Sequence, residues 1–498
     1  MDGLATGITH WREAGYYRAE YRYPGHGVAT DRHCHPDAYI GIARATAQPR
    51  VKEGDNDVIC MNQQQPKQLG LKELVAMGVG GMVGGGIFSV LGLSVGLAGH
   101  AAPIAFALGG TIALLTGWSY ARLGFSFRSD GGSFTYLEHA FRHPNIGGLG
   151  GWLLLVGYIG TLALYAYTFG VYGAVILGNA DHGSPMQHLL GSGVLLAFLG
   201  VNLYGVKAAG RTEDIIVLIK VLILSLFAIV GLFYVKPDHL LPIFDKGELG
   251  VLMGTALIFV AYEGFELIPN AVNEMKDPER NLPRAILLSL LITIAIYIMV
   301  ALVAVGNLLP AEIVKYKEYA LAVAARPFLG HAGFMLIGLG ALLSTASAIN
   351  ATLFGTARLG EVMAKDQALP HAFTIRERTQ DIPWVSLCLI SGVSLLLVNL
   401  GNLTVISAFA SSTFLLIFAS INFAAFRLRQ RIGITPLAPL AGVLLCLVSW
   451  LVLCGYLWKH DRRSLLWMAA FYLGTVALEL LFSQRRRLFN PKRSGKDS

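Results

Sequence analysis

The stretch Gly78-Val79-Gly80-Gly81-Met82-Val83-Gly84-Gly85-Gly86-Ile87-Phe88 lies inside the first long apolar segment of the chain. It places six glycines in nine positions, three of them consecutive, which is poor helix material even in a membrane. Unwound backbone at membrane depth is tolerated only beside protein or a watery cavity, and there its free amides suit a carboxylate. The alternative is close helix packing through small residues. This segment by itself leaves the two readings open.

A second apolar segment is interrupted in the other half of the chain, at Phe259–Glu266 (FVAYEGFE). It contains Gly264 and two acids, Glu263 and Glu266, and an acid inside a membrane is costly and functional by default. Interruptions at corresponding positions of two halves are typical of transporters built from inverted repeats. We therefore expect a 5+5 inverted repeat in which the first and sixth spans are broken.

The composition indicates an all-α integral membrane protein in a lipid bilayer. Hydrophobic residues make up 54% of the 498 residues and charged residues only 14%, against roughly 25% charged in soluble domains. These values exclude a disordered chain and an ordinary nucleic-acid binder, and five cysteines exclude a disulfide scaffold. Apolar runs of membrane length predict twelve transmembrane helices, at about 72–96, 102–126, 149–178, 190–206, 213–235, 250–272, 284–308, 331–358, 384–400, 403–426, 437–457 and 464–483.

The Lys and Arg residues predict the orientation of these spans. With the N-terminus inside, the connections after the even-numbered spans face the cytoplasm and carry about twice as many basic residues as the opposite connections. The C-terminus then also lies inside. The net charge of +8 is mostly this topology signal, and we expect a multi-pass protein of the cell (inner) membrane.

The chain divides into four predicted parts. Residues 1–66 form a polar extension without an apolar signal region, either flexible or outside the true start, for which Met61 is a candidate. Its His33-Cys34-His35 run lacks the second spaced pair of a usual zinc site, so we expect no metal and no cofactor. Residues 67–430 form the transporter core with spans one to ten, residues 431–484 hold the last two spans, and residues 485–498 form a basic cytoplasmic tail.

Four motifs resemble the amino acid–polyamine–organocation superfamily of permeases, which have the leucine-transporter type of fold. Gly84–Phe88 is similar to the family's Gly-Ser-Gly-Ile-Phe, with Gly85 in place of the serine, and Ser129–Leu137 resembles its loop before the third helix. Glu274–Ile286 (EMKDPERNLPRAI) is nearly the family's loop after the sixth helix, and Ala364–Pro370 resembles the end of its eighth. The resemblance covers about residues 68–430, and it looks most like the proton-coupled, broad-specificity amino acid branch.

The resemblance implies transport of an amino acid or a related amine. It also implies that backbone groups, rather than charged side chains, recognise the substrate. Amides of the first broken helix would hold the substrate carboxylate, carbonyls of the sixth would hold its amino group, and the side-chain pocket would include residues near Glu263. Carried over by position, the amides belong to Val83, Gly84, Gly85 and Gly86, and the carbonyls to Phe259, Val260 and Tyr262. Gly85 removes one hydroxyl donor, and Arg122 stands where the family often has an acid, so both departures bear on substrate class.

Lys220 lies within an apolar span, and the resemblance implies that it takes the place of a sodium ion in related sodium symporters. A buried ammonium would bridge the first and eighth helices, and desolvation would let it exchange a proton. Its predicted partners are a carbonyl near Gly80 or Gly81 and the hydroxyls of Ser344, Thr345 and Ser347. The alternative is snorkelling, because the Lys220 stem is about 9 Å of helix rise from Asp214 at the interface.

Several other polar residues have two interpretations each. Either Glu263 or Glu266 would relay protons or contact a cationic substrate, or else one of them would cap the broken half-helix or pair with a basic neighbour. Tyr158, Tyr165 and Tyr167 would line the cavity, or else pack in the core or form an aromatic belt. A cytoplasmic ion network or gate, with plain positive-inside anchoring as the alternative, is predicted at Glu274, Lys276, Arg280 and Arg284.

These observations favour a secondary transporter that moves amino acids together with protons by alternating access. An amino acid or polyamine exchanger is the second interpretation, and a non-transporting amino acid receptor is a third. An enzyme is not expected, because Gly-x-Gly matches inside apolar spans lack the strand–turn–helix context of a nucleotide site. The predicted partners are the substrate, protons and lipid, and no nucleic acid.

Overall fold

A computed structural model describes residues 69–129, 131–141, 144–179, 183–204, 210–366, 368–375 and 383–482. The predicted polar extension with its His33–His35 run, and the predicted basic tail, lie outside the described residues. The described part is helical throughout, and its only β-type pairing is an isolated parallel bridge between Leu69 and Met275.

The helices follow one another in the predicted order. Their bounds are α1 (Leu71–Met82), α2 (Gly86–Ala98), η1 (Gly99–Ala101), α3 (Ala102–Ser126), α4 (Gly132–Ala140), α5 (Pro144–Ile176), α6 (Pro185–Leu203), α7 (Gly210–Leu232), η2 (Pro237–Leu240), α8 (Gly247–Leu257), η3 (Phe259–Tyr262), η4 (Phe265–Glu274), α9 (Pro278–Asn307), α10 (Pro310–Lys315), α11 (Ala320–Ala324), α12 (Arg326–Lys365), η5 (His371–Thr374), α13 (Trp384–Leu400), α14 (Leu403–Arg427), α15 (Arg429–Ile432), α16 (Leu437–His460) and α17 (Arg462–Phe482).

A helix or a broken pair of helices lies at each predicted span. Within the described residues, nine helices are long and apolar enough to cross a membrane, or ten if the bent pair α8 and η3–η4 counts as one span. The number is below twelve for two physical reasons. The first span is split, so that α1 is short and α2 runs through η1 into α3, and α13 at Trp384–Leu400 falls in the shorter class of 10–17 residues.

Both predicted interruptions are present as breaks in the helical backbone. The first break is the segment Val83–Gly85 between α1 and α2, where Val83 leaves helical geometry with ψ 62°. The second break centres on Gly264, whose φ of 123° is a conformation that favours glycine. A separate bend of 50° joins the two members of the sixth span, α8 (Gly247–Leu257) and the segment Phe259–Glu274, so this bend lies just before η3. The sequence prediction of broken first and sixth spans is therefore confirmed.

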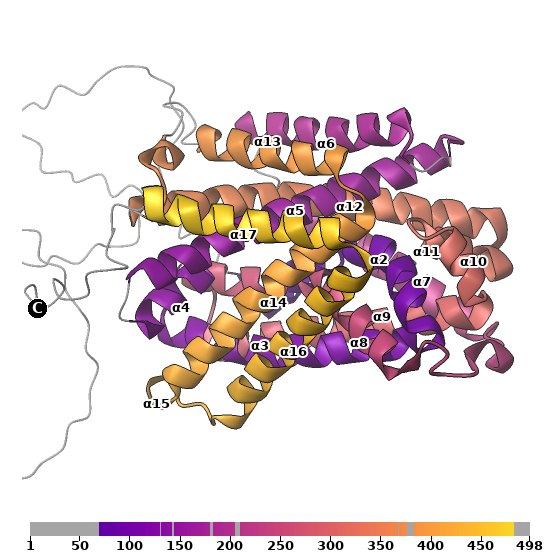
Figure 1. The fold of residues 1–498 in the computed structure, drawn as a ribbon, viewed down its shortest axis with the longest axis horizontal. Coiled ribbons are helices and arrows are strands. Elements are labelled where there is room, and N and C mark those ends of the chain that lie inside the picture. Colours follow the sequence, from indigo (N-terminus) through magenta and orange to yellow (C-terminus); the bar gives the residue numbers. More distant parts are fainter. Residues whose placement is uncertain are drawn as a thin grey trace, which may run out of the picture. The chain divides into compact units, whose positions relative to one another are not determined.

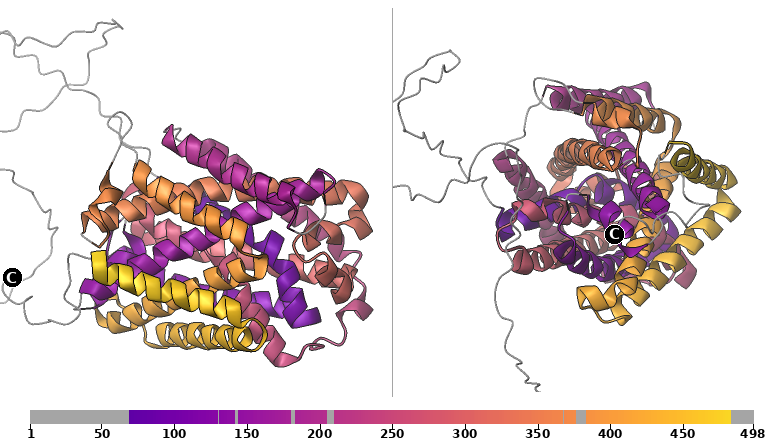
Figure 2. Two further views of the ribbon diagram at one scale, coloured as in Figure 1. Left: turned by 45° about the horizontal axis from the view of Figure 1, so that its top comes forward. Right: turned by 90° about the vertical axis from the view of Figure 1, so that its left-hand side faces the viewer.

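The remaining helices surround these breaks. In Figure 1, α13 lies along α6 at one edge, while α14 and α16 cross the front of the bundle obliquely as a pair. The end-on view in Figure 2 shows the helices running side by side along the long axis of the bundle. Apolar side chains on the outside of α7, such as Leu218 and Leu222, are more than half exposed, as expected for a lipid-facing surface.

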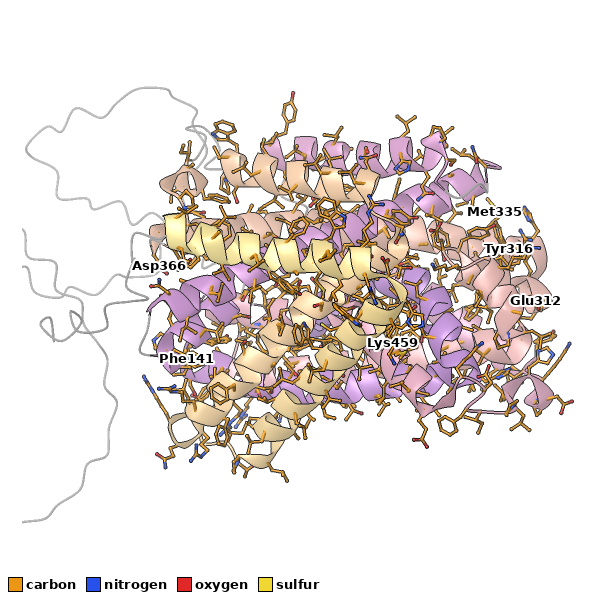
Figure 3. All side chains as sticks on the ribbon, viewed as in Figure 1. Phe141, Glu312, Tyr316, Met335, Asp366 and Lys459 are labelled. Atoms are coloured by element: carbon orange, nitrogen blue, oxygen red, sulfur yellow. The ribbon has the colours of Figure 1, made fainter. Side chains whose placement is uncertain are left out.

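The connections alternate between the two ends of the bundle. Phe141 and Asp366, which follow the second and eighth predicted spans, lie at one end in Figure 3. Glu312 and Tyr316, which follow the seventh, lie at the other end. This is the alternation that the predicted topology requires, while the side that faces the cytoplasm stays a prediction.

Candidate functional site

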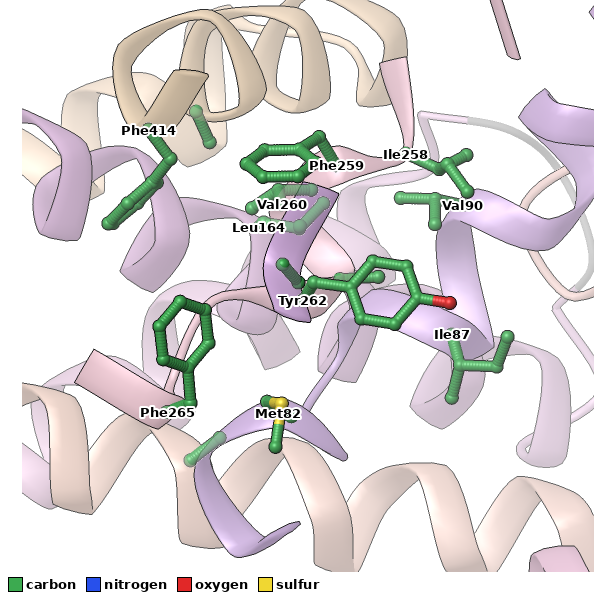
Figure 4. Packing of buried hydrophobic residues seen from close by; sticks show 14 of the residues in the cluster. Met82, Ile87, Val90, Leu164, Ile258, Phe259, Val260, Tyr262, Phe265 and Phe414 are labelled. Atoms are coloured by element: carbon green, nitrogen blue, oxygen red, sulfur yellow. The ribbon is translucent and has the colours of Figure 1, made fainter. Parts of the chain in front are cut away.

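The two breaks touch each other inside the bundle. A Cβ atom added to Gly264 would lie 2.5 Å from the carbonyl carbon of Gly81, and one added to Gly86 would lie 2.8 Å from Ala261 Cα. Met82, Ile87, Phe259, Tyr262 and Phe265 pack around this contact (Figure 4). The glycines therefore serve close packing, and the backbone between α1 and α2 is also unwound, so both readings of the first segment hold.

The first break leaves two buried backbone amides, among the described residues, that could receive an anion. The Val83 amide donates to Val79 O and the Gly84 amide to Met82 O, both at 2.8 Å. The amides of Gly85 and Gly86, at the start of α2, donate to no group in the described part of the chain. Of the four amides predicted to hold a carboxylate, these two are available at a helix N-terminus, where partial positive charge gathers.

Hydroxyl groups from two other helices hold the carbonyls of the first break. Ser344 on α12 lies 2.6 Å from Val83 O and 3.1 Å from Gly84 O. Tyr297 on α9 lies 2.6 Å from Met82 O and 3.0 Å from Ala261 O, so a single phenol contacts both breaks. All of these side chains are fully buried. Tyr297 was not predicted from the sequence, because no motif marks a tyrosine on an apolar helix.

Side chains on α5 and α14 form hydrogen bonds with the residues of the second break. The Gly264 amide donates to Glu266 Oε2 at 2.7 Å, and Tyr158 on α5 donates to Glu266 Oε1 at 3.3 Å. Glu263 is 3% exposed and contacts the hydroxyl of Thr161 on α5. Both acids are thus buried and hydrogen-bonded, and Glu266 caps the break, as one interpretation of the sequence proposed.

The predicted pocket residues are buried but do not all point to one place. The Tyr262 hydroxyl donates to Phe106 O on α3 at 2.6 Å, and its ring lies beside that of Tyr297, with the ring centroids 5.3 Å apart. The ring of Tyr165 lies against Gly84 and Gly85, where an added Cβ would come within 2.9 and 2.8 Å of ring atoms. Tyr165 therefore borders the two free amides, whereas Tyr158 serves Glu266 and Tyr167 donates to Glu318 at 2.6 Å.

Ser411 on α14 supplies hydrogen-bond partners to backbone groups at the bend of the sixth span. Its hydroxyl donates to Leu257 O at 2.7 Å and accepts from the Val260 amide at 2.9 Å. Ser411→Ala is expected to destabilise the protein by about 1–3 kcal/mol, because two buried backbone groups lose their partner. Thermal unfolding of the purified protein would measure this. Ser420→Ala on the same helix, which loses only a bond to Leu416 O one turn earlier, is the control expected to change little; equal effects of the two substitutions would contradict the role of Ser411.

Lys220 on α7 is fully buried, and its ammonium donates to Gly80 O at 2.7 Å. The two helices are close here, since a Cβ on Gly80 would lie 2.7 Å from Val217. The ammonium therefore points toward α1 rather than to the interface, as the coupling interpretation requires. The hydroxyls predicted on α12 do not bind it in this structure: Ser344 contacts the first break, Thr345 donates to Ala341 O at 2.7 Å, and Ser347 is half-buried.

The predicted ion network lies where the sixth span ends. Leu69 N donates to Glu274 O at 2.8 Å and Lys276 N donates to Leu69 O at 2.9 Å, so the segment before α1 is tied to this connection by backbone bonds. The ion pair found beside it joins Arg128 to Glu279 across 3.9 Å, with both side chains largely exposed. An exposed pair at this distance contributes little stability. The roles of Glu274, Lys276, Arg280 and Arg284 stay predictions.

Comparisons with known proteins agree with this architecture. The sequence model of the amino acid permease family matches residues 69–478. An uncharacterised protein of Methanocaldococcus jannaschii is 34% identical over 417 residues, 84% of this chain and 95% of that protein. The inner membrane transport protein YbaT of Escherichia coli is 33% identical over 83% of this chain and 95% of its own length. The serine/threonine exchanger SteT of Bacillus subtilis is 27% identical over 84% of this chain and 97% of its own length.

A solved structure shares the fold. The manganese transporter of Eremococcus coleocola superposes with a TM-score of 0.54, covering 83% of this chain and 95% of that one, at 12% sequence identity. At that identity the likeness concerns the fold alone. The family match and the transporter relatives confirm the expected class, a multi-pass helical transporter and not an enzyme. The chain belongs to the amino acid permease family.

Proposed function

We propose that this protein is a proton-coupled amino acid symporter of the cell (inner) membrane, with both termini in the cytoplasm. The amides of Gly85 and Gly86 bind the substrate carboxylate, and the carbonyls of Phe259, Val260 and Tyr262 bind its amino group. When the two breaks touch, the substrate site is closed. This closed state lies between the inward-facing and the outward-facing states of the cycle. Residues 67–430 supply this machinery, and residues 431–484 are appended to it.

The observation that carries the proposal is the buried Lys220 ammonium on Gly80 O, at 2.7 Å. A cation removed from water and bound to a neutral carbonyl is costly even with Glu213 on the same helix attracting it, and loss of its proton removes that cost. Gly80 lies three residues before the first break, so the protonation state of Lys220 bears directly on the segment that binds substrate. Lys220 thereby supplies the link between proton and substrate that symport needs.

Uptake of radiolabelled L-amino acids into proteoliposomes tests this proposal. Uptake is expected to rise several-fold when the outside is made more acidic than the inside, because protonation from outside is then favoured and release inside follows. The same mixture identifies the substrates. Uptake that is equal with and without the gradient, in vesicles shown to hold the gradient, would contradict symport.

Exchange is the second candidate, and the named activity of the relative SteT supports it. An exchanger needs a counter-substrate and no ion. Vesicles preloaded with unlabelled amino acid would then take up label rapidly, while empty vesicles would take up none even with a proton gradient. That result would show that the protein exchanges substrates at this site and is not a symporter.

A further inference from the structure

A short chain of hydrogen-bonding groups leads from the second break into α5. Glu263 directly precedes Gly264, and its Oε2 contacts Thr161 Oγ1. The same Thr161 oxygen lies 3.1 Å from Gly157 O, one turn earlier on α5. A hydroxyl carries a single hydrogen, so Thr161 cannot donate to both oxygens at once.

Two arrangements of hydrogens satisfy this chain, and they differ by one proton on Glu263. In one, Glu263 is a carboxylate and Thr161 donates to it. In the other, Glu263 Oε2–H donates to Thr161 Oγ1, and Thr161 O–H turns to Gly157 O. Thr161 thus offers a hydrogen-bond partner to the acid in either state, which is what a group that gains and loses a proton inside a membrane requires.

The neighbouring acid differs in this respect. Glu266 accepts from the Gly264 amide on one oxygen and from the Tyr158 hydroxyl on the other. Two donors therefore stabilise the carboxylate of Glu266, whereas Thr161 is the one donor among the described residues that contacts Glu263. A second charge on Glu263 beside it would be disfavoured, because like charges in an apolar site repel strongly.

The groups that face Glu263 do not offset a negative charge. They are Glu266 in its own segment and, on α5, the phenols of Tyr158 and Tyr165, which lie three residues before and four residues after Thr161. No lysine or arginine in the described part of the chain forms an ion pair with Glu263. The side chain is also 3% exposed, so water does not replace a cation in this closed arrangement.

We propose that Glu263 is a proton-binding site of the transport cycle, protonated while the two breaks touch and deprotonated when the second break opens. On opening, the Oε2–H bond breaks, the proton passes to water that enters the break, and Thr161 O–H turns from Gly157 O to the carboxylate. Closure reverses these steps. Gly264, which touches Gly81, is the next residue, so proton loss and loss of the contact between the breaks favour each other. The inference rests on the proposed transport cycle but not on Lys220.

Infrared spectroscopy of the purified protein in lipid tests the proton directly, through the C=O stretch of a protonated carboxyl group that a carboxylate lacks. The wild type at neutral pH is expected to show this band, and Glu263→Gln to lose it. Glu266→Gln should keep it, as should Glu479→Gln, a matched buried acid on α17 that packs against Gly148. Absence of the band in the wild type, its survival in E263Q, or its loss in E266Q would overturn the assignment.

Thr161 provides a second readout. T161V removes the acceptor of the Glu263 proton, so the band should shift to higher frequency, as expected for a carboxyl that has lost a hydrogen bond. T161S keeps the hydroxyl and should restore the wild-type position. An unshifted band in T161V would show that the proton does not point to Thr161.

Exchange of labelled for unlabelled substrate can be measured with the same pH on both sides of the vesicle membrane. This measurement tests the place of Glu263 in the cycle without any proton gradient. Wild-type exchange should fall as the pH is raised, because a charged Glu263 hinders closure, and E263Q should lose this fall. Identical profiles would overturn the inference. Gradient-driven uptake tests symport separately: uptake that ignores the gradient, with a band lost in E263Q, would defeat the proposed symport and leave the Glu263 site supported.

Discussion

We expect Lys220→Met to abolish the stimulation of amino acid uptake by an inward proton gradient, so that uptake with and without the gradient becomes equal. Methionine has similar length and no charge, so it fills the site beside Gly80 but cannot carry a proton. Uptake into proteoliposomes at a fixed outside pH, with and without the gradient, measures the effect.

The stability of the same variant separates a coupling role from a structural one. Because a buried ammonium costs desolvation energy, K220M should unfold at the same temperature as the wild type or higher. Lys220→Arg is the matched cationic variant: its guanidinium does not release a proton in proteins, so gradient-driven uptake should also be lost. A K220M protein that is folded and still responds to the gradient would remove Lys220 from the mechanism.

The breaks were predictable from sequence because glycine and intramembrane acids stand out against apolar helices. Consecutive glycines at 84–86 and the Glu263–Gly264 pair each violate the local pattern, and each proved to interrupt a helix. Lys220 stood out in the same way. Its expected partner, a carbonyl near Gly80 or Gly81, was implied by the family resemblance, in which the lysine takes the place of a sodium ion.

The side chains that hold the breaks were not predictable. Ser411, Tyr297 and Thr161 lie on helices that are apolar both toward lipid and toward the interior, so no amphipathic period shows which face is inside. Ser344 illustrates the consequence. It lies on the expected helix, yet it contacts carbonyls of the first break rather than Lys220. Only the packing of α12 against the break decides between these two partners.

We expect Gly264→Ala to reduce uptake to less than about a tenth of the wild-type rate, and to destabilise the protein. At φ 123° a side chain is strained, at a cost of about 1–3 kcal/mol. The added Cβ would also lie 2.5 Å from Gly81 C and 2.6 Å from Met82 N, and such overpacking costs typically about 1–3 kcal/mol more. Both obstructing atoms belong to the backbone, so no rotamer change relieves the contact, and the two breaks must separate. Uptake and thermal unfolding measure the two effects.

Gly455→Ala on α16 is the matched control, because no atom lies within 4 Å of its added Cβ and its backbone is helical. Alanine there should leave uptake unchanged and stability equal or slightly higher, since it favours helix over glycine by about 1 kcal/mol. The comparison isolates the contact between the breaks from the general effect of an added methyl group. A G264A protein that is less stable but transports at the wild-type rate would show that the cycle does not pass through the closed contact. The proposed link between Glu263, Gly264 and closure would then fail with it.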